Sequence, residues 1–274
     1  MKRPMARGAA IDMRRMADWT RDFTGYRITI TEDRIDRWLA QFRHRDRDLA
    51  ARTLDCVDFV THEQIAASFR QILGMLPGWN IDENLRQGRW RFVAYSGSAG
   101  ESGDTMLHRF RLANNLTGRR FNELFIYRSE LPSGNFGPDD TVVFVDDFSG
   151  TGNQVCTAWP LIRELVPVGP RLFLILIAAC AAAVDRIEHE TDLQVVPYIT
   201  LAERDNLFSS RCTYFTQIEK DRLVQYGLKG DPNHPRGWGD SGLVLVFAHN
   251  CPNDTIPVLH ARRRGWEGLF RRQD

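Results

Sequence analysis

The segment Thr141–Gln154, TVVFVDDFSGTGNQ, is the stretch from which the fold of this 274-residue chain is predicted. After Thr141 comes Val142–Val145, a continuous apolar run of β-forming residues. Such a run is typical of a strand that is buried on both faces in a parallel sheet. Asp146 and Asp147 follow directly. Ligands of open α/β sheets bind at the carboxyl ends of the strands, so we expect both carboxylates to lie in a binding site.

A loop of small residues follows the two carboxylates and precedes a helix-like stretch, Val155–Leu165. Gly150 and Gly152 permit a tight backbone, because glycine adopts positive φ angles and lets a ligand come close. The N–H groups of such a loop, and the positive end of the helix that follows, favour a phosphate group. The carboxylates suit the hydroxyls of a ribose, or a Mg²⁺ ion.

Two common phosphate-binding motifs do not fit this segment. A Walker A loop requires Gly-Lys-Ser/Thr after its glycines, whereas Asn153 and Gln154 occupy those positions. A dinucleotide-binding fingerprint requires a third glycine, whereas Val155 stands there, and no acidic pair precedes the loop in that fingerprint.

Composition and charge exclude several classes of protein. The 43% hydrophobic and 26% charged residues are ordinary for a globular protein, and a net charge of +1 exerts no general attraction for nucleic acids or membranes. Five scattered cysteines with no C-x-x-C pair argue against a zinc site and a disulfide framework, and they favour a reducing cytoplasm. Every apolar run falls short of the ~20 residues that a membrane-spanning helix needs, so we expect no membrane association.

We predict three successive regions. Residues 1–30 have mixed charge and no clear period, so they are expected to form a loose arm with a short helix near 13–19. Residues 31–80 are predicted to form a helical cap, because apolar residues recur there at helical spacing after helix start signals. An independent partner-binding domain is the alternative for this region. Residues 89–274 are predicted to form an α/β domain.

The α/β domain is expected to alternate strands with helices, which is the rhythm of a parallel sheet. The expected strands are residues 90–95, 121–127, 142–145, 172–177, 193–199 and 243–247. The expected helices are residues 104–116, 155–165, 178–190 and 214–226. Residues 128–140, rich in Pro, Gly, Asn and Ser, are expected to form a loop, and the basic tail with Trp266, Leu269 and Phe270 is expected to pack back onto the body.

A second loop of small residues follows the strand expected at 90–95. It consists of Ser96, Gly97, Ser98, Ala99 and Gly100 and precedes a helix, which is again an anion-binding arrangement. Arginine side chains can pair bidentately with phosphate oxygens. The candidate arginines are Arg109, Arg111, Arg119, Arg120 and Arg128. The sequence therefore predicts two anion-binding loops that are one βα unit apart.

The central segment resembles the PRPP-binding loop of type I phosphoribosyltransferases, where PRPP is 5-phosphoribosyl 1-diphosphate. That pattern has four apolar residues, two acidic residues, two variable residues and a Thr/Ser-Thr-Gly-like turn. The matching residues are Asp146, Asp147, Thr151 and Gly152, whereas Gly150 replaces the usual first Thr or Ser.

Two further stretches narrow the resemblance. They are Trp38–Phe42, WLAQF, and the motif His249–Pro257, HNCPNDTIP, near the end of the chain. With the two loops, they make the chain similar to PRTase-CE, the phosphoribosyltransferase-like family of bacterial conflict systems, over roughly residues 30–270. The resemblance implies a type I phosphoribosyltransferase-like parallel sheet flanked by helices, with an N-terminal helical cap, and a PRPP or nucleotide-like ligand.

The resemblance also implies roles for individual residues. The catalytic pair would be Asp146 and Asp147, which would accept hydrogen bonds from the ribose hydroxyls, with Mg²⁺ near them held mostly through ligand and water. The 5′-phosphate would be bound by Ser149, Gly150, Thr151, Gly152, Asn153 and Gln154. The pyrophosphate would be held by Ser96, Gly97, Ser98, Ala99 and Gly100. The acceptor side would include His249 and Asn250.

Three activities stay open after this assignment. The leading hypothesis is transfer or removal of a ribosyl group. The second is a regulator that senses PRPP or a nucleotide without turnover. The absence of lysine from residues 128–140 favours it, because many biosynthetic members use a lysine or an acidic residue there. The third is a Mg²⁺-dependent phosphohydrolase, for which other strand ends offer only Glu203 and Asp205.

The resemblance finally implies macromolecular partners. The protein would serve as an effector in anti-phage defence, for instance beside a retron reverse transcriptase with its RNA and DNA. Mutual burial of the helical cap would give a homo-oligomer. These partners follow from the family resemblance and not from composition or spacing.

Overall fold

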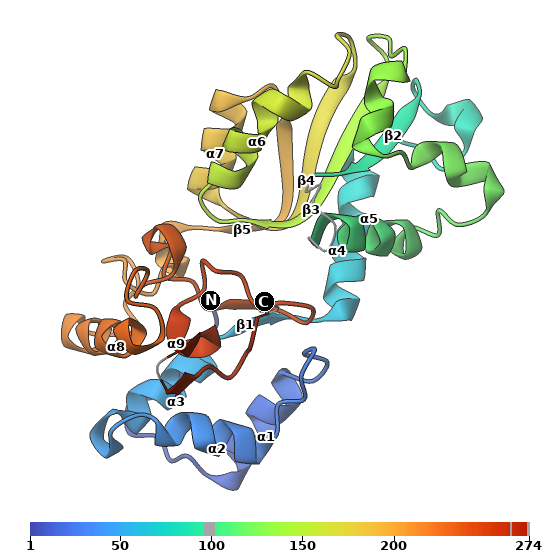
Figure 1. Cartoon of the computed structure of the whole chain (residues 1–274). Helices are drawn as coiled ribbons and strands as arrows, with labels where there is room; N and C mark the ends of the chain where they lie inside the picture. The colour runs from blue at the N-terminus through green and yellow to red at the C-terminus, as the bar shows by residue number, and fades with distance from the viewer. Residues whose placement is uncertain (96–101, 264, 273–274) are drawn as a thin grey trace. The chain divides into compact units, whose positions relative to one another are not determined.

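The computed structural model describes residues 1–95, 102–263 and 265–272. The chain forms two compact units (Figure 1). The inserted unit is Glu63–Leu201, and the terminal unit consists of Met1–His62 together with Ala202–Asp274. This division differs from the three contiguous regions expected from the sequence, because the two ends of the chain share one hydrophobic core.

The inserted unit is built on a four-stranded parallel sheet in the order β2-β3-β4-β5. Its strands are β2 (Trp90–Ala94), β3 (Thr141–Ser149), β4 (Arg171–Cys180) and β5 (Gln194–Leu201). The run Val142–Val145 is fully buried between two neighbouring strands, as its continuous apolar character predicted. The α/β class with a parallel sheet is therefore confirmed.

Helices cover both faces of this sheet (Figure 1). They are α4 (His62–Met75), α5 (Ser102–Ala113), α6 (Asn153–Arg163) and α7 (Ala181–Glu190). On the face of α6 and α7, the rings of Phe144 and Trp159 meet at a centroid distance of 5.5 Å. On the other face, Phe110 of α5 packs on Phe92 of β2 at 4.8 Å. No helix of the described ranges combines the length and hydropathy that crossing a bilayer requires.

The strand predicted at residues 121–127 is wrong, because a 3-10 helix spans Arg119–Leu124 instead. Its buried residues, Phe121 and Leu124, are three apart, and this spacing suits a 3-10 turn rather than the alternation of a strand. Phe125 then makes an isolated parallel bridge with Phe92. The loop predicted at 128–140 begins with a second 3-10 helix, Arg128–Ser133.

The terminal unit contains a parallel pair of short strands, β1 (Asp58–Val60) and β6 (Leu245–Phe247). The strand predicted at 243–247 is therefore confirmed, but it pairs outside the four-stranded sheet. Helix α3 (Arg47–Asp55) ends before Phe59 and Val60, which enter this strand pair.

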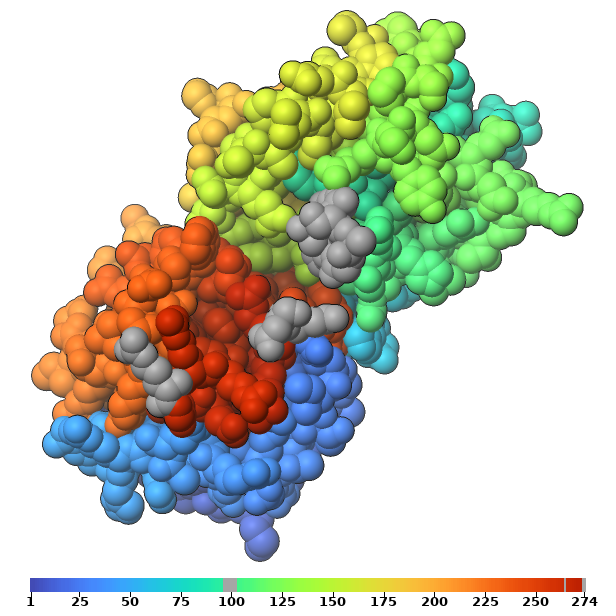
Figure 2. All heavy atoms as spheres, viewed as in Figure 1, coloured from blue at the N-terminus to red at the C-terminus, as the bar shows by residue number. Residues whose placement is uncertain are grey.

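The core of the terminal unit is aromatic and draws on both ends of the chain. Its other elements are α1 (Met13–Asp22), α2 (Glu32–Ala40), α8 (Gln217–Gly230), α9 (Pro257–His260), β7 (Arg262–Arg263) and β8 (Trp266–Glu267). Phe42 lies at its centre, with ring-centroid distances of 4.5 Å to Tyr226 and 5.2 Å to Trp266. Figure 2 shows N-terminal and C-terminal atoms side by side in this unit. Trp266, Leu269 and Phe270 are buried, as predicted for the tail.

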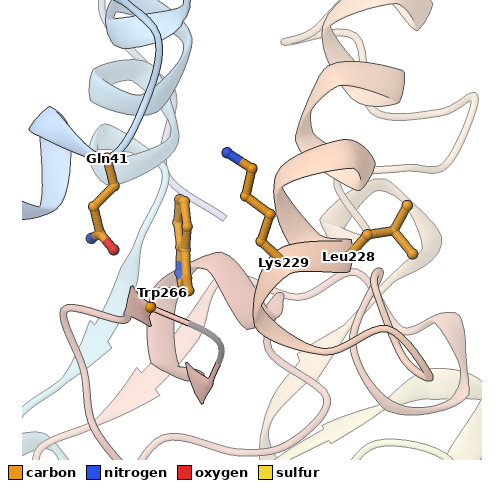
Figure 3. Close-up of a pocket in the computed structure, with 5 residues that line it drawn as sticks. Gln41, Leu228, Lys229 and Trp266 are labelled. Carbon is orange, nitrogen blue, oxygen red and sulfur yellow. The ribbon is translucent and has the colours of Figure 1, made fainter.

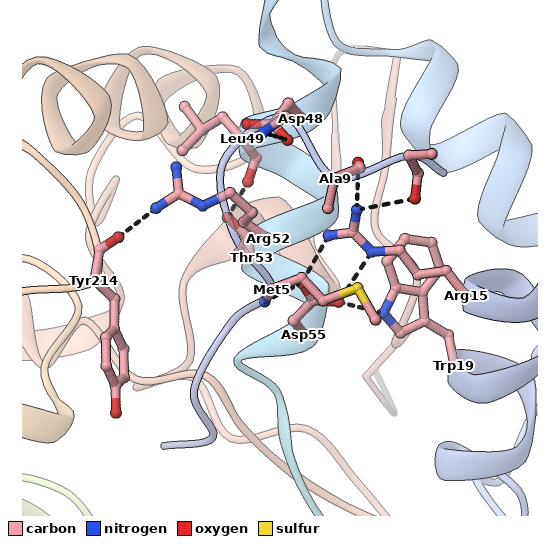
Figure 4. A network of polar contacts seen from close by, with 12 residues as sticks. Met5, Ala9, Arg15, Trp19, Asp48, Leu49, Arg52, Thr53, Asp55 and Tyr214 are labelled. Carbon is pink, nitrogen blue, oxygen red and sulfur yellow. Dashed lines mark hydrogen bonds and ion pairs between the residues drawn. The ribbon is translucent and has the colours of Figure 1, made fainter. Parts of the chain in front are cut away.

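A buried polar network joins the first residues of the chain to α3 (Figure 4). Asp55 accepts hydrogen bonds from Arg15 Nη2 at 2.6 Å, from Trp19 Nε1 at 3.0 Å and from the backbone N–H of Met5 at 2.9 Å. The Arg15 side chain is 2% exposed, so its charge is balanced almost entirely within the protein. Residues 1–30, expected to be a loose arm, are thus fastened to the core by α1.

Asp254 is one of the buried carboxylates of the terminal unit. It accepts a hydrogen bond from Ser241 Oγ at 2.9 Å, and burial raises its pKa to about 6. The same group ionises near pH 4 in an unfolded chain. Between these two values the folded state binds more protons than the unfolded state, so the contribution of Asp254 to stability falls as the pH rises.

We expect Asp254→Asn to remove this pH dependence. The unfolding free energy of the variant minus that of wild type should rise by up to about 3 kcal/mol from pH 4 to pH 7, because each pKa unit corresponds to about 1.4 kcal/mol. Urea unfolding of both proteins across this pH range measures the rise. A cost of the asparagine that does not depend on pH shifts the whole curve of unfolding free energy against pH and leaves its slope unchanged. Parallel pH curves for the two proteins would contradict the assignment.

Candidate functional site

The two acidic residues of the central segment lie inside β3, which extends to Ser149. Asp146 is buried, stands opposite Leu176 of β4 and accepts a hydrogen bond on Oδ1 from the backbone N–H of Asp147 at 2.9 Å. Asp147 is half-buried. Because successive side chains of a strand point to opposite faces, the two carboxylates leave β3 on different faces close to its carboxyl end.

The loop after β3 turns the chain directly into α6. Gly152 is the N-cap of α6 and has a φ of +73°, and Thr151 Oγ1 accepts a hydrogen bond from the backbone N–H of Asn153 at 3.3 Å. Ser149 is buried and Thr151 half-buried, whereas Asn153 and Gln154 are exposed. The first N–H groups of a helix have no partner within it, so the amino end of α6 favours an anion beside the carboxylates.

Helix α7 holds this loop from one side. A Cβ atom at Gly152 would lie 3.2 Å from the carbonyl oxygen of Ala183 and 3.2 Å from Cγ1 of Ile187. Arg186 donates a hydrogen bond from Nη1 to the carbonyl oxygen of Thr151 at 3.3 Å. Two features therefore favour glycine at position 152: the positive φ of the backbone and the close approach of α7.

We expect Gly152→Ala to destabilise the inserted unit by about 1–2 kcal/mol, because an L-residue with positive φ is strained. Gly74 in α4 provides the matched control, since a Cβ atom there meets nothing within 4 Å and its φ lies outside the positive range. Gly74→Ala should stabilise the unit by about 0.5–1 kcal/mol. Urea unfolding measures both changes, and shifts of the same sign would contradict the account of Gly152.

The site offers Mg²⁺ only part of a ligand set. The carboxylate oxygens of Asp146 and Asp147 are the hard donors that Mg²⁺ prefers. In the described ranges, no group of three or more His, Cys, Asp or Glu residues is arranged to hold a metal ion. The Mg²⁺ ion that the family resemblance implies near Asp146 and Asp147, held mostly through ligand and water, stays a prediction.

Two further groups of residues were predicted to belong to the site. The loop of Ser96, Gly97, Ser98, Ala99 and Gly100 lies outside the described residues. His249 and Asn250 belong to the terminal unit, where they follow β6. Asn250 closes a turn there with hydrogen bonds to and from the backbone of Phe247, at 3.1 and 3.0 Å, and the His249 ring stacks on the Phe247 ring. Their contact with an acceptor stays a prediction.

The two further carboxylates considered for a phosphohydrolase serve local structure. They lie in the 3-10 helix Glu203–Asp205 of the terminal unit. Asp205 accepts a hydrogen bond from the backbone N–H of Ala202 at 2.9 Å, and Glu203 accepts one from Ser209 Oγ at 3.0 Å.

Two of the candidate arginines, Arg111 and Arg128, have different partners. Arg111 is occupied within the fold, since it donates to the carbonyl oxygen of Leu116 at 3.0 Å and to Asn122 Oδ1 at 2.7 Å. Arg128 instead donates from Nη1 to the carbonyl oxygen of Tyr95 at 3.1 Å. Tyr95 directly follows β2, the strand next to β3, so this contact places Arg128 at the carboxyl edge of the sheet.

Two residues of the site were missed by the sequence analysis. Arg186 reaches a loop 35 residues before it, and the Tyr95 hydroxyl reaches a carbonyl oxygen 60 residues after it. No local pattern marks either residue, because both act through partners that the fold brings together.

A separate pocket of about 570 Å³ lies in the terminal unit (Figure 3). It is lined by Gln41, Leu228, Lys229, Gly265 and Trp266. The Lys229 ammonium group lies 4.7 Å from the Tyr226 ring, so it is held over an aromatic face. The described residues that line this pocket include no carboxylate and none of the residues predicted to bind a ligand. The acidic strand end is therefore the better supported site.

Comparison with known proteins identifies one family. The PRTase-CE family model matches residues 35–272. A comparison with curated proteins finds no match.

Three solved structures are similar to parts of the chain. Orotate phosphoribosyltransferase from Mycobacterium tuberculosis H37Rv with inorganic phosphate has 20% identity and a TM-score of 0.31, covering 50% of this chain and 69% of that one. The Aeropyrum pernix orotate phosphoribosyltransferase has 15% identity and a TM-score of 0.31, and the match covers 49% of this chain and 69% of that one. The Mycobacterium tuberculosis H37Rv enzyme with PRPP has 19% identity and a TM-score of 0.33, and the match covers 68% of this chain and 94% of that one.

Proposed function

Because the chain belongs to the PRTase-CE family, we propose that it binds PRPP, or a related ribose 5-phosphate ligand, at the carboxyl end of β3 and transfers or removes the ribosyl group. The observation that carries this proposal is the junction of β3 and α6. Asp146 and Asp147 are followed there by a glycine-shaped loop and by the amino end of a helix. Acceptors for ribose hydroxyls thus lie beside a phosphate-binding element.

Each part of this junction has a distinct task in the proposed reaction. The carboxylates of Asp146 and Asp147 accept hydrogen bonds from the 2′- and 3′-hydroxyls and so orient the ribose. The N–H groups from Gly150 to Gln154, with the hydroxyls of Ser149 and Thr151, hold the 5′-phosphate. A bound Mg²⁺ ion, held near Asp146 and Asp147 mostly through ligand and water, would supply positive charge that offsets the charge of the pyrophosphate.

The proposed chemistry is electrostatic rather than acid–base. As the bond between the ribose and the pyrophosphate breaks, positive charge develops on the sugar and negative charge on the leaving group. The nearby carboxylates stabilise the first charge, and Arg128 at the sheet edge stabilises the second. Groups that are already fixed by the fold act most strongly, which gives the bracing of the loop by Arg186 a functional meaning.

A PRPP or nucleotide sensor without turnover is the second candidate, and the segment 128–140 favours it. This segment has no lysine. Glu130 Oε2 accepts a hydrogen bond from the backbone N–H of Tyr127 at 2.7 Å. Burial would raise the pKa of Asp140, but hydrogen bonds from Arg89 and from the N–H of Gly137 hold it below its usual range. Both carboxylates thus have structural partners.

Calorimetric titration with PRPP and Mg²⁺, followed by assays for pyrophosphate and phosphate release with a panel of nucleobases, tests the proposal. Binding with pyrophosphate release supports the transferase. Binding without any release supports the sensor, and release of inorganic phosphate supports the phosphohydrolase. Absence of binding by PRPP, ribose 5-phosphate and nucleotides would overturn the proposal.

The family resemblance also underlies a proposed biological role. The protein would act as an effector of an anti-phage defence system, with a reverse transcriptase and its RNA and DNA as partners, or as a homo-oligomer. Affinity purification from cells that carry the neighbouring genes, with sequencing of the retained nucleic acid, tests this role. Recovery of the protein alone as a monomer would contradict it.

A further inference from the structure

Tyr95 is buried at the carboxyl end of β2 and contacts three elements of the inserted unit. Its backbone N–H donates to the carbonyl oxygen of Val145 in β3 at 3.0 Å. Its hydroxyl donates to the carbonyl oxygen of Val155 in the first turn of α6 at 2.7 Å. Its carbonyl oxygen accepts a hydrogen bond from Arg128 Nη1 at 3.1 Å. The ring packs edge-on against Phe144, which limits its movement.

The bond from Tyr95 to α6 lies next to a gap in the hydrogen bonds of the helix. Pro160 lies inside α6, and proline has no N–H to donate to the carbonyl oxygen of Cys156. The amino-terminal part of α6 therefore has fewer hydrogen bonds of its own than an uninterrupted helix. The buried Tyr95 hydroxyl supplies a fixed point at Val155, next to the end that is proposed to bind phosphate.

The bond from Tyr95 to Arg128 fixes a cation at the same sheet edge. A guanidinium group has five N–H donors in a planar arrangement, so one bond to a carbonyl oxygen orients the others. Within the described part of the chain, Arg128 forms no ion pair with a carboxylate. Its side chain is half-buried, so its charge can meet an anion at reduced cost of desolvation.

We propose that Tyr95 is a positioning residue that holds two phosphate-binding elements at once. Its hydroxyl fixes the amino end of α6, which takes the 5′-phosphate, and its carbonyl oxygen fixes the guanidinium of Arg128, which takes the pyrophosphate. This inference rests on the proposed function, since the two anions are those of a ribose 5-phosphate ligand.

The roles of the Tyr95 hydroxyl and of the Arg128 guanidinium can be tested separately. Variants of each residue are titrated with ribose 5-phosphate and, independently, with inorganic pyrophosphate. Tyr95→Phe removes the hydroxyl and keeps the carbonyl oxygen, so it should weaken ribose 5-phosphate binding about threefold to tenfold and leave pyrophosphate binding within twofold. Arg128→Ala should weaken pyrophosphate binding at least tenfold, and Arg128→Lys should restore part of it.

A matched control comes from the terminal unit. The buried Tyr226 hydroxyl donates to Asp46 Oδ2 at 2.8 Å and accepts from the backbone N–H of Arg43 at 3.0 Å, so Tyr226→Phe removes buried tyrosine hydrogen bonds in the other unit. Tyr226→Phe should lower stability without changing the affinity for either probe. The proposal is overturned if Tyr95→Phe weakens ribose 5-phosphate binding no more than Tyr226→Phe does, or if it weakens both probes equally.

Amide hydrogen exchange decides the positioning role without a ligand. Faster exchange in the first turns of α6 in Tyr95→Phe, but not in Tyr226→Phe, supports it, and unchanged exchange overturns it. If wild type binds neither probe while α6 exchanges faster in Tyr95→Phe, the proposed function fails and the positioning role stands.

Discussion

Replacing Asp146 and Asp147 together with asparagine should abolish calorimetrically detectable binding of PRPP. Each substitution removes charge-assisted hydrogen bonds to ribose hydroxyls that contribute about 1.5–3 kcal/mol, so the pair contributes about 3–6 kcal/mol. That loss corresponds to a decrease in affinity of about 10²–10⁴-fold. The amide of asparagine occupies nearly the same volume, so the packing at the end of β3 should be retained.

The single variants should differ from each other. Asp146 is buried and its Oδ1 already accepts the N–H of Asp147, whereas Asp147 is half-buried. Asp147→Asn should therefore lower affinity without lowering stability, and Asp146→Asn should lower both. Titration with PRPP and Mg²⁺, together with urea unfolding, measures the two effects.

The acidic pair Asp82 and Glu83 provides a matched control in the same unit, because both residues are exposed. Asp82→Asn/Glu83→Gln removes the same formal charge and should bind PRPP as wild type does. If this control loses affinity as strongly as the Asp146/Asp147 variant, the effect is one of net charge and the site assignment is wrong.

Replacing Asp55 with alanine should destabilise the terminal unit by about 3–5 kcal/mol, because it leaves the buried charge of Arg15 without a partner. The N–H groups of Trp19 and Met5 lose the same acceptor (Figure 4). Urea unfolding followed by tryptophan fluorescence measures the change. Asp55→Asn keeps one acceptor oxygen and should cost less.

The exposed pair of Arg37 and Asp33 in α2 serves as the comparison, since their side chains are 72% and 76% exposed. Asp33→Ala removes an ion pair of similar length, 2.7 Å, yet should change the unfolding free energy by no more than about 0.5 kcal/mol. Equal effects of the two substitutions would show that burial of Arg15 does not control the stability of this unit.

Those parts of the fold that depend on neighbouring residues were predictable from the sequence. The apolar run Val142–Val145 predicts a buried strand without any knowledge of the strands beside it. The glycines after it predict a turn into a helix. The end of β3 and its loop were therefore identified correctly as one junction, although the strand itself extends to Ser149. What binds at that junction stays a prediction.

Features that depend on distant partners were not predictable. Leu245–Phe247 reads as a strand, but nothing in it indicates that it pairs with β1 rather than with the main sheet. Phe121 and Leu124 suit a strand by composition, and only their burial against the sheet reveals a 3-10 turn. Tyr95 reads as the end of a strand, and its contact with Val155 appears only when α6 is in place.

The discontinuous terminal unit sets an order of events during synthesis. Residues 63–201 separate its two halves, so its first half must wait for about 140 residues to be translated. At ~5–20 residues per second this delay is about 7–30 s. While residues 63–201 are being translated, Trp38 and Phe59 lack the partners that residues 202–270 supply, whereas every strand of the four-stranded sheet lies within residues 63–201. The four-stranded sheet can therefore form before the core of the terminal unit, whose N-terminal half lacks its apolar partners for longer.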